Sequence, residues 1–208
     1  MKTLTKNLLD QISPLQGIEL LRAGNERFVK NLKFNRNLLQ QANETSDGQH
    51  PFAVIISCMD SRTSAEIVFD QGLGDIFSIR IAGNVINEDI VGSAEFGCKA
   101  VGAKIILVLG HTNCGAIKGA VQNVELGHLH FITHKIQRCL PRIKQDHPNL
   151  HEYELCQKVT KENVLQGIID LKYKSTILAD MVYKKEITIV GGIYDLSSGI
   201  VEFFEAET

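Results

Sequence analysis

The chain of 208 residues lacks several features that would place it in a special structural class. It has no tryptophan, four prolines and no uninterrupted apolar run approaching the roughly 18 to 20 residues of a membrane-spanning helix. Residues 1–10 carry charges every few positions and lack the apolar core of a secretory signal. These absences argue against a membrane-spanning or exported protein, and we expect the chain to be cytoplasmic.

An excess of charge of one sign is missing as well. The 22 Lys and Arg residues are balanced by 24 Asp and Glu residues, and no long basic stretch is interleaved with aromatic residues. Because nucleic-acid-binding surfaces carry such stretches, we expect neither a nucleic-acid nor a membrane partner. With 44% hydrophobic and 22% charged residues, the composition is typical of a globular protein long enough for one compact domain.

Cysteine is present in an odd number in a chain with no export signal, which argues against a disulfide framework. The five cysteines are instead interpreted as reduced thiols, metal ligands or core residues. Cys98, Cys139 and Cys156 lie in segments of helical composition, and we expect them to be packing residues.

Hydrophobic periodicity divides the chain into alternating strands and helices. Helical spacing predicts an amphipathic helix over residues 14–32, and a polar stretch without a period predicts an extended connector over residues 35–50. Short β-branched runs, typical of strands covered on both faces, occupy residues 52–57, 76–81, 104–109 and 187–193. Predicted helices lie at residues 64–70, 89–101, 115–124 and in two longer pieces within 128–182, and an edge strand lies at residues 200–204.

This order predicts an α/β fold with a parallel β-sheet core of about four strands plus an edge strand, flanked by helices, with an N-terminal helical arm. We expect a single domain over residues 1–208. Residues 1–50 would form the N-terminal helix and connector arm, and residues 51–208 the zinc-binding α/β core. Ligands of such sheets bind beyond the carboxyl ends of the strands.

Two of the predicted strands run directly into side chains that bind metals. The first leads into Cys58, and the third leads into His111 and Cys114. If these strands are neighbours, two thiolates and an imidazole meet. That ligand set suits tetrahedral zinc with its fourth position available.

Neighbouring residues would affect the pKa values of the two thiols and place a charged group beside the metal. A capping box at residues 63–66 and a helix beginning after Cys114 would place helix N-termini beside the two thiols and lower their pKa values. Asp60 and Arg62 would form an ion pair that keeps the carboxylate charged and positioned beside the metal. Two alternatives stay open: Asp60 is the fourth ligand of a closed structural site, or the ion pair only braces a turn.

Other candidate motifs are weaker. Gly72-Leu73-Gly74-Asp75 precedes a strand instead of following one, so we interpret it as a turn and not as a phosphate-binding loop. His130 and His134 are four residues apart on a predicted helix, but the glutamate of a zinc-protease helix is missing between them. We interpret these histidines as part of a solvated or interface face.

Cys58-x-Asp60-x-Arg62 followed by His111-x-x-Cys114-Gly115 resembles the β-class carbonic anhydrases. The resemblance extends over nearly the whole chain, through the segments Gly24-Asn25-x-Arg27-Phe28, Asp70-Gln71-Gly72-Leu73-Gly74-Asp75, Arg80-Ile81-Ala82-Gly83-Asn84 and Gly192-Ile193-Tyr194-Asp195. It implies a zinc-dependent lyase that hydrates carbon dioxide reversibly to bicarbonate and a proton by attack of zinc-bound hydroxide. It also implies one zinc ion per subunit and self-association as a homodimer or homotetramer, with the active site at the dimer interface.

The resemblance assigns a role to each site residue. Cys58, His111 and Cys114 would hold zinc, and Asp60 with Arg62 would form the catalytic dyad. The implied substrate-binding residues are Gln49 as a hydrogen-bond donor, Phe77 and Ala82 as apolar walls, Gly115 through its backbone, and Phe96, which replaces a tyrosine that the family often contributes from the partner subunit.

One subclass of the family closes at lower pH, when bicarbonate fills a pocket that includes a tryptophan. Ile55 stands at that tryptophan's position, although Arg80 and Tyr194 match the other two residues of the pocket. The resemblance therefore predicts the open arrangement, without steep inhibition by bicarbonate. Two alternatives stay open: a same-fold hydrolase of carbon disulfide or carbonyl sulfide, and a catalytically silent zinc-binding module.

Overall fold

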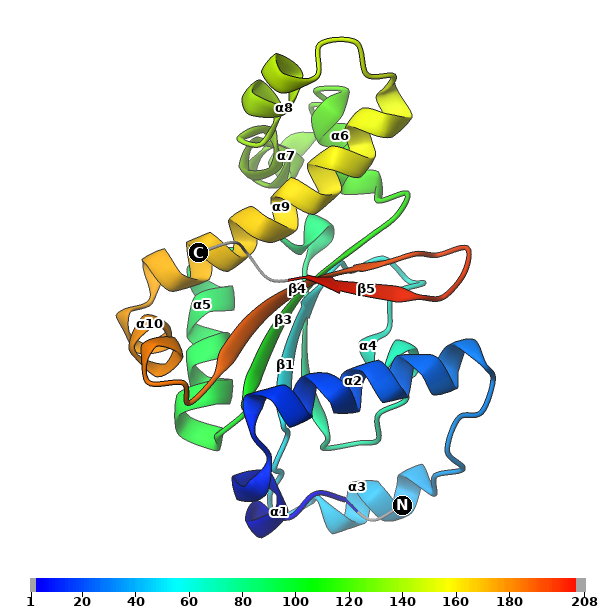
Figure 1. Ribbon diagram of the computed structural model, residues 1–208, viewed down its shortest axis with the longest axis vertical. Coiled ribbons are helices and arrows are strands. Elements are labelled where there is room, and N and C mark those ends of the chain that lie inside the picture. The colour runs from blue at the N-terminus through cyan, green and yellow to red at the C-terminus, as the bar shows by residue number, and fades with distance from the viewer. Residues whose placement is uncertain (1–2, 205–208) are drawn as a thin grey trace.

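The computed structural model describes residues 3–204, which contain one five-stranded sheet. The strands follow one another across the sheet in the order β2-β1-β3-β4-β5 (Figure 1). The first four are parallel, and β5 pairs antiparallel with β4. Their bounds are β1 (Ala53–Ser57), β2 (Ile76–Arg80), β3 (Ile105–His111), β4 (Thr188–Tyr194) and β5 (Val201–Phe204). The predicted fold class and all five predicted strands are thus confirmed, with boundary shifts of one or two residues.

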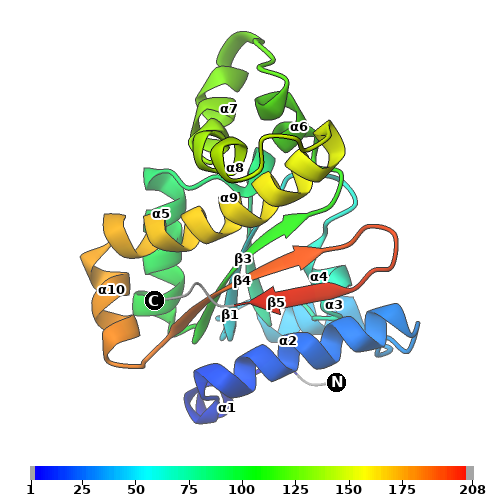
Figure 2. The ribbon, with the colours of Figure 1, turned by 45° about the horizontal axis from the view of Figure 1, so that its top comes forward.

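Helices cover both faces of the sheet, so every residue of β1 and β3 is buried. Figure 2 shows α5 (Glu88–Glu95), α9 (Glu152–Lys174) and α10 (Thr176–Tyr183) on one side and α2 (Pro14–Val29) on the other. Alternate residues of β1 enter the two cores, Val54 and Ile56 on one face and Ala53 and Ile55 on the other. This double covering explains the continuous apolar runs in the sequence.

The N-terminal helix α2 is part of this core. It begins at a capping box between Ser13 and Gln16 and buries Ile18 and Leu21 against the sheet. Its glycine Gly17 permits close approach, since a Cβ there would lie 2.3 Å from Ile105 Cδ1. The short helix α1 (Lys6–Gln11) precedes it.

Three predicted segments were wrong in detail. Residues 35–50 contain a helix, α3 (Leu38–Glu44), whose two turns are too short to show a period but are capped by the Asn37 side chain. The region 128–182 holds four helices instead of two, because proline and capping residues interrupt it. They are α7 (His130–Gln137), which follows the 3-10 turn η3 (Gly127–Leu129), α8 (Leu140–Asp146), α9 and α10. The predicted helix 89–101 divides into α5 and a π-helical turn, η2 (Phe96–Val101), that ends at Gly102.

A buried carboxylate joins the N-terminal arm to the core. Asp70 is 2% exposed and accepts hydrogen bonds from the guanidinium groups of Arg27 and Arg36 and from the backbone N–H of Phe34. Burial alone would raise the pKa of Asp70, but the hydrogen bonds from the two arginines outweigh it and lower that pKa. We call these four residues the Asp70 cluster.

The segment after Asp70 forms the turn predicted at residues 72–75. The backbone N–H of Gly72 donates to Asp75 Oδ2 at 2.7 Å, and Gly74 has a φ of +86°. Within residues 3–204, no helix has the length and apolar character needed to cross a membrane.

Candidate metal centre

The carboxyl ends of β1 and β3 bring three potential metal ligands together. The two strands are neighbours, with Ser57 opposite Leu109, so the residues that follow them meet at one edge of the sheet. Cys58 follows β1, His111 ends β3, and Cys114 precedes the helix α6 (Gly115–Val121). Their ligand atoms all lie within 4.8 Å of one another, and the two Sγ atoms are 3.9 Å apart.

All three side chains are at least 95% buried. Across the described range 3–204, this is the one group of three or more His, Cys, Asp or Glu ligand atoms gathered so closely.

The imidazole of His111 is oriented as a metal ligand. Its Nδ1 lies 2.9 Å from the carbonyl oxygen of Thr112, and because a carbonyl only accepts, Nδ1 carries the hydrogen. Nε2 is then the nitrogen with a free lone pair, and it is buried without a hydrogen-bond partner. A metal ion satisfies such a buried nitrogen, and the carbonyl contact is the usual support of a metal-bound histidine. The donor set of two thiolates and one imidazole therefore fits zinc.

The two thiols interact strongly. The hydrogen bond with Cys114 lowers the pKa of Cys58 to about 4, assisted by His111 and by the backbone N–H of Gly83, which lies 3.3 Å from Cys58 Sγ. The same contact, together with burial, raises the pKa of Cys114. The sequence-based expectation that helix N-termini lower both pKa values gives the right direction for Cys58, where the neighbouring thiol is the main cause instead, and is wrong for Cys114. The backbone amides at the start of α6 act in the expected direction, but the neighbouring thiolate outweighs them.

Asp60 and Arg62 form a bidentate ion pair beside the three ligands. Arg62 Nε lies 2.9 Å from Asp60 Oδ1, and Arg62 Nη2 lies 2.8 Å from Oδ2. These hydrogen bonds hold the pKa of Asp60 well below its usual range. The carboxylate stays ionised at neutral pH and acts only as a hydrogen-bond acceptor.

The loop that carries Cys58 and Asp60 is braced from two directions. The Thr63 hydroxyl lies 3.0 Å from the carbonyl oxygen of Cys58 and 2.9 Å from that of Asp60. Arg80 Nη2 donates to the same Asp60 carbonyl at 2.6 Å. These contacts join residues up to 20 positions apart, so local sequence pattern does not reveal them.

The capping box predicted at residues 63–66 is wrong. The helix α4 (Ala65–Val68) begins after Ser64, whose side chain makes no capping hydrogen bond. The Thr63 hydroxyl is engaged with the loop carbonyls, and the Glu66 carboxylate instead accepts a hydrogen bond from Ser78 on β2.

The residues expected to bind substrate fall into two sets. Ala82 and Gly115 adjoin the metal ligands: Ala82 precedes Gly83 in the 3-10 turn η1 (Ala82–Asn84), and Gly115 follows Cys114. The other three, Gln49, Phe77 and Phe96, make no hydrogen bond or ring contact with the ligand group in the described part of this chain.

Phe77 and Phe96 of the second set lie at the outer edge of the sheet, which β2 forms. Gln49 is exposed on the segment before β1. The rings of Phe77 and Phe96 are 6.3 Å apart and line a hollow of about 560 Å³ over β2 and α5. Phe96 is 58% exposed.

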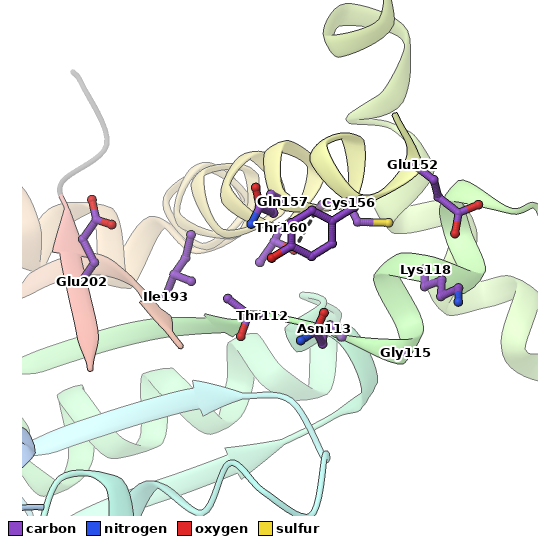
Figure 3. Close-up of a pocket in the computed structure, with 12 residues that line it drawn as sticks. Thr112, Asn113, Gly115, Lys118, Glu152, Cys156, Gln157, Thr160, Ile193 and Glu202 are labelled. Carbon is purple, nitrogen blue, oxygen red and sulfur yellow. Dashed lines mark hydrogen bonds between the residues drawn. The ribbon is translucent and has the colours of Figure 1, made fainter. Parts of the chain in front are cut away.

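Sequence reasoning did not predict the larger hollow beside the ligand group. It has a volume of about 630 Å³ and lies between the loop after β3, the start of α6, and α9. Figure 3 shows Gln157 and Thr160 of α9 opposite Thr112. Cys156 lines this hollow and is half-buried, whereas Cys98 and Cys139 are buried packing residues as expected, and burial raises the pKa of Cys98 to about 12.

Comparisons with known proteins agree with this geometry. The chain matches the family model described as Carbonic anhydrase over residues 53–201. The carbonic anhydrase of Mycolicibacterium smegmatis is 32% identical over 197 residues, covering 91% of this chain and 93% of that protein. The crystal structure of the β-carbonic anhydrase CafA of Aspergillus fumigatus has a TM-score of 0.76 at 24% identity and covers 92% of each chain. One of the crystal structures of two tetrameric β-carbonic anhydrases from Sordaria macrospora has a TM-score of 0.70 at 21% identity. The match covers 79% of this chain and 89% of that chain. The two structural likenesses establish the fold.

Proposed function

The chain belongs to the β-carbonic anhydrase family, a family of lyases, and from this premise we propose that it hydrates carbon dioxide reversibly to bicarbonate and a proton. Cys58, His111 and Cys114 hold one zinc ion per subunit. The observation that carries the proposal is the closeness of these three ligands, with His111 Nε2 buried and unpartnered. Bound zinc lowers the pKa of water from 15.7 toward about 7, which supplies a nucleophile near neutral pH.

Asp60 orients that nucleophile. Since the carboxylate is held ionised by Arg62, it accepts a hydrogen bond from the attacking O–H and directs the oxygen lone pair toward the carbon of carbon dioxide. Thr63 and Arg80 fix the loop beneath it. The amide N–H of Gln49 donates to the developing bicarbonate oxygen.

A second copy of the chain completes the site. Phe77 and Phe96 lie at the open edge of the sheet, where β2 has no outer neighbour among the described residues, and they line a hollow that does not include their own metal ligands. In a homodimer joined along this edge, these rings and Gln49 form the wall of the partner's site. A homotetramer of such dimers is the larger assembly, since the Sordaria macrospora enzymes are described as tetrameric.

Mixing two variants of lowered activity tests the shared site. A chain with Gln49→Ala and Phe96→Ala is combined with a chain carrying Asp60→Asn. In a mixed dimer, one of the two sites combines the metal ligands and Asp60 of the first chain with the unchanged Gln49 and Phe96 of the second chain. Hydration activity therefore recovers on mixing. No recovery, with mixed dimers shown by native mass spectrometry, contradicts the shared site.

The open arrangement at the metal is part of the proposal. Both Asp60 oxygens bond to Arg62, and the close group of ligand atoms comprises Cys58, His111 and Cys114 without Asp60. Ile55, at the position of the regulatory tryptophan, is fully buried in the core. Water therefore has access to the fourth position near neutral pH.

We expect the remaining features of the chain to accord with this role. The N-terminal helices pack into the same core as the sheet, which supports one domain over residues 1–208 with an arm at 1–50 and an α/β core at 51–208. A cytoplasmic location would keep the thiols of Cys58 and Cys114 reduced and able to bind zinc.

Stopped-flow hydration of carbon dioxide, from about pH 6.5 to 9 on protein of measured zinc content, tests the function. Fast zinc-dependent hydration that persists at pH 7 supports the open-site enzyme. Activity confined to pH values above about 8 contradicts the open arrangement. Full zinc content without hydration at any pH overturns the proposal. Carbonyl sulfide and carbon disulfide are then the substrates to test, and a lack of activity on both indicates a catalytically silent zinc-binding module.

A further inference from the structure

Three histidines gather on the surface at the start of α7, in a part of the molecule that the proposed reaction does not use. His130 and His134 are one helical turn apart, with ring centroids separated by 5.8 Å and the rings edge to face. His128 precedes them in η3, 6.5 Å from His130. Its ring stacks against Phe131 at an interplanar angle of 15°.

His130 has the same internal support as the buried metal ligand His111. Its Nδ1 lies 2.7 Å from the carbonyl oxygen of Gly127, so Nδ1 carries the hydrogen and Nε2 has the free lone pair. A carbonyl held in this way fixes the tautomer and makes the other ring nitrogen a better ligand. His134 is exposed and makes no hydrogen bond within residues 3–204, so its ring is free to turn.

We propose that His130 and His134 form a second metal site, which binds a transition-metal ion that prefers imidazole, such as Ni²⁺, Cu²⁺ or Zn²⁺. Two histidines four residues apart on a helix present their ring nitrogens on one face. Metal–nitrogen bonds of about 2.0–2.1 Å place two tetrahedrally bound rings about 5 Å apart. The observed 5.8 Å separation closes to that value by a small rotation of the exposed His134 ring.

The surroundings of the pair determine which ions it accepts. Both histidines line a hollow of about 570 Å³ with Lys135, Arg138 and Lys174. Its one lining carboxylate, Asp170, is already engaged, with Oδ2 bonded to Arg138 at 2.7 Å and Oδ1 bonded to Gln166 at 2.9 Å. Since Mg²⁺ and Ca²⁺ require oxygen ligands, the site excludes them.

The same surroundings set the strength of binding. Two protein ligands, with water completing the coordination, hold an ion less tightly than the three ligands of the buried centre. The charge of Lys135, which forms no ion pair within residues 3–204, weakens binding further, whereas Arg138 and Lys174 are paired with Asp170 and Glu88. The result is an exchangeable site that shares no residue with the buried metal centre.

Calorimetric titration of the untagged, zinc-loaded protein with Ni²⁺ tests the site. One further equivalent of Ni²⁺ per chain is expected, and His134→Ala or His130→Asn weakens its binding at least tenfold. His147→Ala, which removes an exposed histidine on the separate helix end after α8, leaves binding unchanged. Mg²⁺ produces no binding heat attributable to this pair.

Three outcomes overturn the site. The first is the absence of any additional Ni²⁺ equivalent in the wild-type protein. The second is an equal loss of binding in the His147→Ala control. The third is a loss in His128→Ala without a loss in His134→Ala, which would assign the ion to a different pair. Thermal unfolding of each variant confirms that it is folded, so a loss of binding is a property of the site.

Discussion

The Cys58, His111 and Cys114 group and the Asp70 cluster are both buried and polar, yet they are satisfied in different ways. Asp70 is surrounded by donors from its own chain, namely Arg27, Arg36 and the backbone of Phe34. His111 Nε2, in contrast, has no hydrogen-bond partner among the residues that the structure describes. A buried polar group that the chain itself satisfies stabilises the fold, whereas one left unpartnered beside two thiols is suited to an external ion.

Replacing a metal ligand gives the largest effect that this comparison predicts. Cys58→Ala, His111→Ala or Cys114→Ala should each lose stoichiometric zinc and lower hydration by more than about 100-fold, because ligand removal costs more than the 10- to 100-fold typical of supporting residues. Zinc analysis and stopped-flow hydration on the same samples measure both losses.

Cys98→Ala is the matched control, since Cys98 is an equally buried thiol outside the ligand group. It should keep its zinc. Stoichiometric zinc in all three ligand variants would refute the assigned ligands.

Replacing Asp70 should have the opposite effect to replacing a metal ligand. It should lower the free energy of unfolding and leave the hydration rate per folded molecule near that of the wild type. Asp70→Asn leaves two arginines beside a buried position without a counter-charge, and loss of one partner of a buried ion pair costs about 3–5 kcal/mol. Urea unfolding measures the free energy of unfolding, while activity per folded molecule stays near that of the wild type. Asp180→Asn, which breaks the exposed Asp180–Lys184 pair, should change stability little.

The stability lost in Asp70→Asn should depend on pH in a defined direction. Because the folded-state pKa of Asp70 is lowered, its contribution to stability is complete above the unfolded value of about 3.9 and disappears as pH falls through the folded value. The stability difference between wild type and Asp70→Asn should therefore be constant near neutral pH and shrink below about pH 4. A difference that grows in acid would contradict the assigned role.

The sequence could predict the metal group better than the Asp70 cluster for a physical reason. Cys58, His111 and Cys114 directly follow apolar strands, and parallel strands bring their carboxyl ends to one edge. The partners of Asp70 come from the end of α2 and the segment before α3, which have no regular relation to it in the sequence. Thr63 was misread for a similar reason, because its hydroxyl can cap a helix or bind loop carbonyls and tertiary contacts decide between them.

Asp60→Asn should have an intermediate effect confined to the chemistry. An amide can present an N–H to the nucleophile where the carboxylate only accepts, and it loses the charge that pairs with Arg62. Zinc content should be unchanged, while hydration falls by about 10- to 100-fold, the range of supporting groups at metal sites. Asp146→Asn, a remote surface change, is the control, and an unchanged rate in Asp60→Asn would remove Asp60 from the mechanism.

The smallest predicted effect lies in the loop that carries both Cys58 and Asp60. Thr63→Val keeps the shape of a side chain that is 1% exposed but removes the hydroxyl that donates to the two loop carbonyls. Arg80 still donates to both carbonyls, so the cost in unfolding free energy should be about 1 kcal/mol, at the low end for a lost buried hydrogen bond.

Thr63→Ser, which retains the hydroxyl, should recover most of the stability and the hydration rate. A hydration rate that falls in Thr63→Val at full zinc content, and recovers in Thr63→Ser, would place Thr63 among the positioning residues of the site. If Thr63→Ser loses stability while Thr63→Val keeps the wild-type stability and the wild-type rate, the methyl packing of Thr63 matters and its hydroxyl does not. Among the described residues, the side-chain hydrogen bonds that support the two loop carbonyls would then be those of Arg80.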